Sequence, residues 1–193
     1  MKKIFLLLII FFVFLINTFA ENTSPYKIEY WIANVKGGVS YPVGEFANYV
    51  NPSFDVSATI RKGLDMELSV GGSFTYAVLP YKQPDAPTNF TATIINVEVA
   101  YTPYMPDFFL WPYAKAGLGI FLLKYSKLIS KDESKAEQDT SIGIILGGGV
   151  IYPIGNIFAA NLEVLYNYTS QAGGTGDVNT FLTLNAGIMM YIK

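Results

Sequence analysis

The chain has 193 residues, of which 15% are charged and 16% aromatic, and its formal net charge is −2. The length suits a single domain, and the mild acidity, with Arg61 as the only arginine, argues against a nucleic-acid partner, which needs a basic face. The sequence contains no cysteine and no histidine, which excludes disulfides and zinc–thiolate sites and removes the commonest general base. We therefore expect no cofactor, no metal site and no enzymatic activity.

The beginning of the chain is expected to be a secretion signal. Two lysines precede an unbroken apolar run at 4–16, and small residues follow at Thr18 and Ala20. A basic start, a short apolar stretch and a small-residue cleavage site are typical of a signal peptide. A transmembrane anchor is the alternative, but the uncharged stretch is at the short edge of what a helical span needs. We expect residues 1–20 to be cleaved and residues 21–193 to form one domain.

A period of two in hydrophobicity follows the predicted signal and indicates β-strands. In the clearest case, Leu64 to Val78, apolar residues occupy the even positions and mostly polar or small residues the odd ones. Strands of soluble domains usually have ~5–6 residues, whereas a membrane-crossing strand needs ~9–11, so this length favours the membrane. Seven other segments show the pattern with varying clarity: 31–41, 54–61, 95–102, 113–125, 141–152, 158–167 and 181–192. An even count is typical of bacterial barrels.

The links between these segments alternate between long and short. Tight turns are predicted at Lys62-Gly63 and at 153–156, and the link at 103–112 is longer and aromatic. Long loops on one side and short turns on the other are typical of outer-membrane barrels. We expect both chain ends on the periplasmic side, and an extracellular partner at the four long, polar links, which are 42–53, 79–91, 126–140 and 169–178. The most charged of them, 126–140, is expected to be a solvated surface loop.

Aromatic residues gather near the predicted strand ends. Such residues form girdles at the two lipid–water interfaces of membrane barrels, although the core of a soluble β-sandwich would also use them. One group is Tyr101, Tyr104, Phe108, Phe109, Trp111, Tyr152 and Phe158, and the other is Tyr41, Tyr76, Tyr81, Phe90, Tyr125, Tyr166 and Tyr168.

Short glycine- and tyrosine-rich motifs follow one another along the chain. They are GGVSYPVGEF at 37–46, PYAKAGLG at 112–119, GGGVIYP at 147–153 and LYNY at 165–168. In this order they resemble strands of the outer-membrane β-barrel family that includes the OmpA transmembrane domain and the OmpX- and OmpW-like small barrels. The resemblance covers nearly all of 26–193. It implies an all-β fold, an eight-stranded antiparallel up-and-down transmembrane β-barrel in the bacterial outer membrane.

The last predicted strand resembles the signal that the barrel-insertion machinery reads in this family. That signal has a polar residue, a glycine two positions later, and hydrophobic or aromatic residues three and five positions beyond the glycine. Asn185, Gly187, Met190 and Ile192 occupy these places, but neither Met190 nor Ile192 is aromatic and Lys193 extends the end. The resemblance implies two partners, which are the insertion machinery during biogenesis and the outer-membrane lipid.

Several charged residues fall on the strand faces opposite the apolar ones. In lipid each would cost a few kcal/mol, so we expect them to point into the lumen, where opposite charges can pair. An eight-stranded lumen is just wide enough to be filled by side chains, which favours a structural ion-pair network over a proton or ion path. The candidates for this network are Lys36, Arg61, Glu67, Glu98, Lys115 and Glu163.

Glycine clusters at Gly117, Gly119 and 147–149 allow two interpretations. A phosphate-binding loop would need a strand-to-helix junction and, in a P-loop, a following Lys-Ser/Thr, and neither is present. Glycine in a barrel strand more often marks a bend or a close approach.

Four functions remain open at this point. The leading hypothesis is a structural or surface-interaction barrel that presents four loops outside the cell. The alternative is a narrow pore or carrier for small hydrophobic molecules. An outer-membrane enzyme acting on lipid A or peptides would be expected to use histidine with serine or aspartate, and the sequence has no histidine and no evident substitute base near a nucleophile. A soluble ligand-binding barrel would need polar outward faces, which residues 64–78 do not provide.

Overall fold

The computed structural model describes residues 30–82, 89–103, 105, 109–130, 133–169 and 180–192. The predicted secretion signal therefore lies outside the described residues, and so does the predicted loop at 169–178 apart from Thr169. Within the described residues, no helix is long and apolar enough to cross a membrane.

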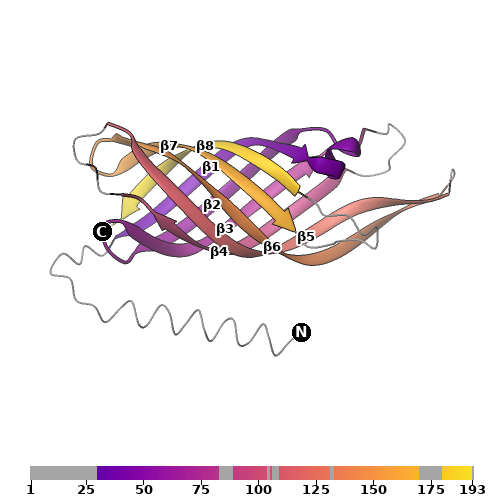
Figure 1. Ribbon diagram of the computed structural model, residues 1–193, viewed down its shortest axis with the longest axis horizontal. Helices are drawn as coiled ribbons and strands as arrows, with labels where there is room; N and C mark the ends of the chain where they lie inside the picture. The colour runs from indigo at the N-terminus through magenta and orange to yellow at the C-terminus, as the bar shows by residue number, and fades with distance from the viewer. Residues whose placement is uncertain are drawn as a thin grey trace, which may run out of the picture.

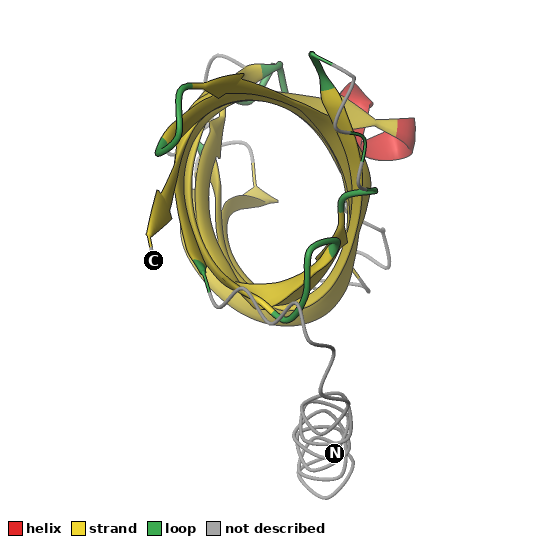
Figure 2. Ribbon diagram, turned by 90° about the vertical axis from the view of Figure 1, so that its left-hand side faces the viewer, coloured by secondary structure: helices red, strands yellow, loops and turns green. Residues whose placement is uncertain are grey.

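The chain forms a closed barrel of eight antiparallel strands in sequence order, as predicted (Figures 1 and 2). The last strand pairs with the first, from Trp31 opposite Ile192 to Val43 opposite Thr180, which closes the sheet. A closed sheet leaves no unpaired edge, as a bilayer requires. The elements are β1 (Trp31–Val43), the 3₁₀ helix η1 (Gly44–Asn48), β2 (Ser53–Gly63), β3 (Leu68–Leu79), β4 (Phe90–Tyr101), β5 (Trp111–Ser130), β6 (Glu133–Ile154), β7 (Phe158–Thr169) and β8 (Thr180–Ile192).

The two ends of the barrel differ. The turn end holds the start of β1, the end of β8 and the links β2–β3, β4–β5 and β6–β7. The loop end holds the other four links, including η1 and the tip of the β5–β6 hairpin. The β6–β7 turn contains Gly155, whose φ of 75° lies in the left-handed region that glycine adopts without strain.

The outer face of the barrel is apolar, whereas the inner face carries both polar and apolar side chains. Along β7, Leu162 and Val164 are exposed on the outer face, whereas Asn161 and Glu163 are buried on the inner face. A soluble barrel would show the opposite pattern. An apolar outer face on this scale is stable when lipid covers it.

Exposed aromatic residues lie near both ends of the outer face. Trp31, Tyr101, Tyr152 and Phe158 are near the turn end, and Tyr41, Phe54, Tyr76, Tyr166 and Tyr168 are near the loop end. Phe90, assigned from the sequence to a girdle, is instead buried in the apolar core of the barrel, where its ring contacts Phe46 edge-on. The assignment was wrong because Phe90 falls on the inward-facing parity of β4.

The turn between β2 and β3 lies later than predicted. It spans Leu64 to Glu67, rather than Lys62-Gly63, so the predicted strand from Leu64 begins only at Leu68. The Asp65 carboxylate accepts hydrogen bonds from the backbone N–H groups of Glu67 (2.8 Å) and Leu68 (2.6 Å). An aspartate that bonds the backbone two and three residues ahead favours a turn over a continuing strand.

The segment predicted as a surface loop at 126–140 is paired strand apart from 131–132, which lie outside the described residues. The β5–β6 ladder continues from Lys124 opposite Gln138, past Lys127 opposite Lys135, to Ser130 opposite Glu133. This hairpin extends beyond the other strands at the loop end (Figure 1). The loop was predicted from the high charge of this segment. A two-stranded ladder that projects into water can be polar throughout, because the register of β5 and β6 is already set within the barrel.

Glycines mark close approaches between strands, as predicted for Gly117, Gly119 and 147–149. A Cβ added to Gly117 would lie 2.9 Å from the Val97 carbonyl oxygen, and one added to Gly149 would lie closer still to that of Leu162.

The inward-facing Gly71 and Gly187 show the same feature beside charged residues. A Cβ added to Gly71 would lie 2.5 Å from the Cα of Arg61, and one added to Gly187 would lie 2.6 Å from the Cγ of Lys36. Gly37, by contrast, is exposed on the outer face, and its added Cβ would meet nothing closer than 3.9 Å.

We expect Gly71→Ala to lower the free energy of unfolding by about 1–3 kcal/mol, because the methyl group would push the β2 backbone away. Gly37→Ala is the matched control and should leave stability unchanged or raise it by up to about 1 kcal/mol. Denaturant titration of the barrel refolded in lipid vesicles measures both values. Equal losses in the two variants would contradict the close packing at Gly71.

Candidate functional site

Five buried charged residues form a continuous chain of alternating charge across the lumen, which we call the ion-pair chain. Lys36 Nζ lies 2.5 Å from Glu163 Oε1, and Lys115 Nζ lies 2.9 Å from Glu163 Oε2. Lys115 also lies 3.2 Å from Glu98 Oε2, and Arg61 Nε lies 3.7 Å from Glu98 Oε1. The chain therefore joins β1, β7, β5, β4 and β2 through their side chains.

Strand alternation and register place these side chains together. All five fall on the inner face of their strands, and each is 6% exposed or less. Their neighbours in the sheet are often glycines: Lys36 pairs with Gly187, and Glu98 pairs with both Gly71 and Gly117. Each of these large charged side chains thus has a glycine beside it in the sheet, and the missing glycine side chain leaves space for it in the lumen.

Tyr113, which the sequence analysis did not select, extends the ion-pair chain. Its hydroxyl donates a 2.8 Å hydrogen bond to Glu163 Oε2, and the Asn161 amide donates a 3.5 Å bond to the same hydroxyl. The Arg61 guanidinium lies 5.9 Å from the centre of the Tyr113 ring, a cation–π distance. The signal was present in the sequence, because Tyr113 shares its inward parity with Lys115.

Asp55 is a sixth buried charged residue, and it was not among the predicted candidates. It is 3% exposed, and its Oδ2 accepts a 3.0 Å hydrogen bond from Ser40. Its parity on β2 matches that of Arg61, which could have identified it. With Asp55, the buried charges of the described lumen are three cations and three carboxylates.

The structure does not bring Glu67 into the ion-pair chain. Glu67 lies in the β2–β3 turn at the end of the barrel, where its carbonyl accepts a 2.7 Å hydrogen bond from the Thr102 N–H. The sequence interpretation failed because the alternation was counted from Leu64, whereas the strand begins after the Asp65-stabilised turn.

Apolar side chains lie on both sides of the ion-pair chain. Toward the loop end the core contains Phe46, Val50, Ala77, Leu79, Phe90, Ala92, Ile94, Phe121, Leu123, Ile145, Leu165 and Phe181. Toward the turn end it contains Ile32, Tyr113, Ile151, Ala159 and Met189. Exclusion of water strengthens the charge pairs, and it makes any unpaired charge there costly.

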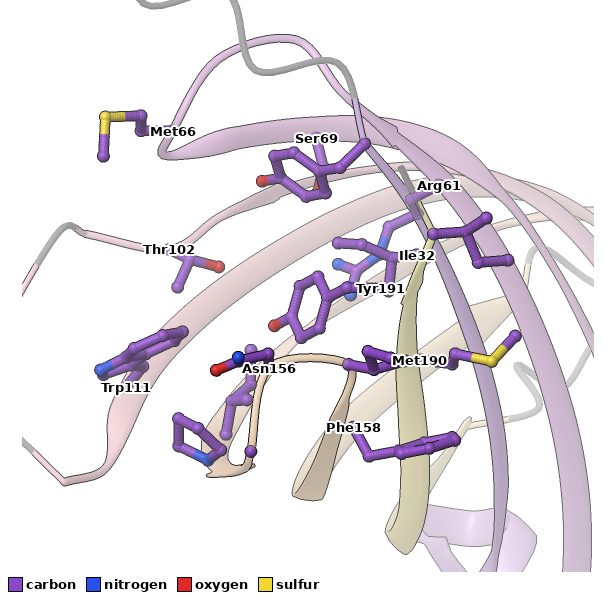
Figure 3. Close-up of a pocket in the computed structure, with 16 residues that line it drawn as sticks. Ile32, Arg61, Met66, Ser69, Thr102, Trp111, Asn156, Phe158, Met190 and Tyr191 are labelled. Atoms are coloured by element: carbon purple, nitrogen blue, oxygen red, sulfur yellow. The ribbon is translucent and has the colours of Figure 1, made fainter.

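A cavity of about 920 Å³ opens at the turn end, on the far side of the second apolar cluster, and we call it the mouth cavity. Tyr30, Trp111 and Tyr191 contribute to its walls, and Arg61 reaches it from the ion-pair chain (Figure 3).

The four residues of the predicted insertion signal divide between the two faces of β8. Asn185, which is 1% exposed, and Gly187 face the lumen. Met190 and Ile192 have the opposite parity, and Ile192 is 43% exposed. Recognition by the insertion machinery stays a prediction.

Glu163→Gln should destabilise the barrel by about 3–5 kcal/mol, because it leaves Lys36 and Lys115 buried without the carboxylate they share. Glu67→Gln is the control outside the ion-pair chain and should change stability by less than about 1 kcal/mol. Denaturant unfolding in vesicles compares them. A Glu163→Gln loss as small as that of the control would show that the pairs are not energetically important.

Solved structures resemble this chain in fold, whereas comparisons of its sequence find no match. No family model and no curated protein sequence matches the chain. Neisserial surface protein A matches with a TM-score of 0.62 at 18% identity, over 83% of this chain and 96% of that one. Pseudomonas aeruginosa OprG matches with a TM-score of 0.57 at 12% identity, over 86% of this chain and 97% of that one. Yersinia pestis Ail matches with a TM-score of 0.50 at 18% identity, over 85% of this chain and 98% of that one. The resemblance stated from the sequence is confirmed at the level of the fold: this chain has the fold of the small eight-stranded outer-membrane β-barrels.

Proposed function

We propose that this protein spans the bacterial outer membrane as a non-enzymatic structural or surface-interaction barrel whose lumen is closed by its own side chains. The observation that carries the proposal is the ion-pair chain, which crosses the lumen from β1 to β2 between two apolar clusters. Eight strands enclose a lumen that side chains can fill, so a connected set of this size leaves little room for a water path.

The outward-facing part in this proposal is the loop end, with segments 42–53, 79–91, 126–140 and 169–178. Two described features support a surface role there. The β5–β6 hairpin projects beyond the barrel, and η1 is anchored by Phe46, which is buried in the loop-end apolar cluster. Two of the structural neighbours are named as a surface protein and as an attachment–invasion protein, and a similar role here extends that analogy.

A narrow pore or a carrier for small hydrophobic molecules is the second candidate. The mouth cavity favours it, because a preformed, largely apolar cavity of this size is typical of small-molecule sites. For transport, however, a molecule would have to pass the ion-pair chain and the loop-end cluster.

We expect the mature chain, residues 21–193, to be electrically silent in a planar bilayer after refolding, because the ion-pair chain interrupts the water path. A pore-forming barrel inserted in the same bilayer provides the positive control, and protease protection in vesicles verifies insertion. Reproducible stepwise currents would contradict the closed lumen and favour transport.

An epitope tag between Ser130 and Glu133 should be accessible to antibody on intact cells, because the loop end is proposed to face outward. The same tag at Gly155-Asn156, in the β6–β7 turn, is the matched control and should react only after the outer membrane is permeabilised. The reverse pattern would overturn the proposed orientation.

A further inference from the structure

The mouth cavity combines aromatic walls with a single charge. Among its described lining residues, Arg61 is the only one that carries a formal charge. Tyr30, Trp111 and Tyr191 supply aromatic surface around it. Figure 3 shows the Arg61 side chain reaching toward the cavity between Ile32 and Tyr191.

The charge of Arg61 is incompletely compensated within the protein. Its partner Glu98 is shared with Lys115, which lies closer, at 3.2 Å against 3.7 Å. Arg61 Nε has no hydrogen-bond partner, although the residue is only 3% exposed. A buried guanidinium N–H without an acceptor is costly, so an additional acceptor would be favourable here.

The rest of the lumen does not supply that acceptor. The ion-pair chain contains three cations and two carboxylates, which leaves one positive charge. The remaining buried carboxylate, Asp55, is six residues from Arg61 on the same strand, or about 20 Å at ~3.3 Å per residue. Asp55 instead lies opposite Gly38, two residues from Lys36 on β1, so it is at the Lys36 end and the excess charge is at the Arg61 end, beside the cavity.

We propose that the mouth cavity binds one amphipathic carboxylate, a molecule with a single carboxylate and a long apolar chain. The carboxylate pairs with the Arg61 guanidinium, whose planar fork of donors matches it, and the apolar chain packs against the aromatic walls. The cavity volume of about 920 Å³ lies in the range of small-molecule sites. A cationic amphiphile is disfavoured by the charge of Arg61, and a neutral one leaves the guanidinium without its acceptor. This site goes beyond the proposed surface role and does not depend on whether the lumen conducts.

The two tryptophans allow a direct test. Trp111 lines the cavity, whereas Trp31 is 48% exposed on the outer face. Trp31→Phe leaves Trp111 as the reporter of the cavity, and Trp111→Phe leaves Trp31 as the matched reporter of partitioning into lipid. The probes are dodecanoic acid brominated at its end and the corresponding brominated alcohol, titrated in alkaline buffer into phosphatidylcholine vesicles that contain the barrel.

We expect the acid to quench Trp111 saturably, at a concentration at least about tenfold lower than the alcohol requires, which corresponds to about 1.4 kcal/mol. Trp31 should be quenched only as the probes partition into lipid, with no saturable component. Equal quenching of Trp111 by acid and alcohol, or no saturable quenching, would overturn the proposal.

Two variants identify the charge that is responsible. Arg61→Met should abolish the preference for the acid over the alcohol. Thr102→Glu, on the cavity wall and outside the ion-pair chain, should weaken binding of the acid about tenfold by repulsion, and Thr102→Gln should not. If Arg61→Met does not fold, the comparison of Thr102→Glu with Thr102→Gln tests the role of charge in the cavity. A preference for the acid that survives both charge changes would contradict a site centred on Arg61.

Discussion

The structure depends on one electrostatic constraint: charges buried inside a narrow barrel must be compensated by one another. Removal of a single charged group from water costs several kcal/mol, and only close, well-aligned partners offset that cost. The ion-pair chain meets this requirement because Glu163 and Glu98 each have two cationic partners, and Lys115 bridges them. Strand register, inward glycines and barrel closure all serve to bring these groups within contact distance.

The same constraint connects the interior to the proposed functions. Apolar clusters toward both ends of the lumen limit the access of water to the carboxylates and lysines of the ion-pair chain, which strengthens their pairing and supports a closed lumen. Interaction with partners is then left to the two ends of the barrel. The loop end has the projecting β5–β6 hairpin, and the turn end has the mouth cavity, where the least compensated member of the chain, Arg61, meets an apolar space.

Much of the fold could be predicted from the sequence because a membrane barrel leaves a strong local pattern. The two faces of each strand meet different solvents, so a period of two identifies both the strands and their inward residues. Lys36, Arg61, Glu98, Lys115 and Glu163 were selected in this way. Their pairwise contacts could not be predicted, because these depend on the register between strands that are distant in sequence.

The failures have structural causes. Asp65 forms side-chain bonds in the turn between β2 and β3, so Glu67 lies in that turn and not in a strand facing the lumen. The hairpin tip at 126–140 lies beyond the other strands, where lipid no longer imposes a pattern, and its pairing depends on the ladder beneath it. Asp55 and Tyr113 share the inward parity of Arg61 and Lys115, but their bonds to Ser40 and Glu163 depend on contacts between strands that the local pattern does not contain.

A coupling measurement through Lys115 tests the ion-pair chain most directly. Glu98 and Glu163 are both within 3.2 Å of Lys115 Nζ, so the loss of both carboxylates leaves that cation with neither partner. The unfolding free energies of Glu98→Gln, Glu163→Gln and the double variant should be non-additive, with the double loss exceeding the sum by about 0.5–3 kcal/mol. In a Lys115→Met background the same cycle should become additive within about 0.5 kcal/mol. Additivity in the native background would contradict a connected chain of charges across the lumen.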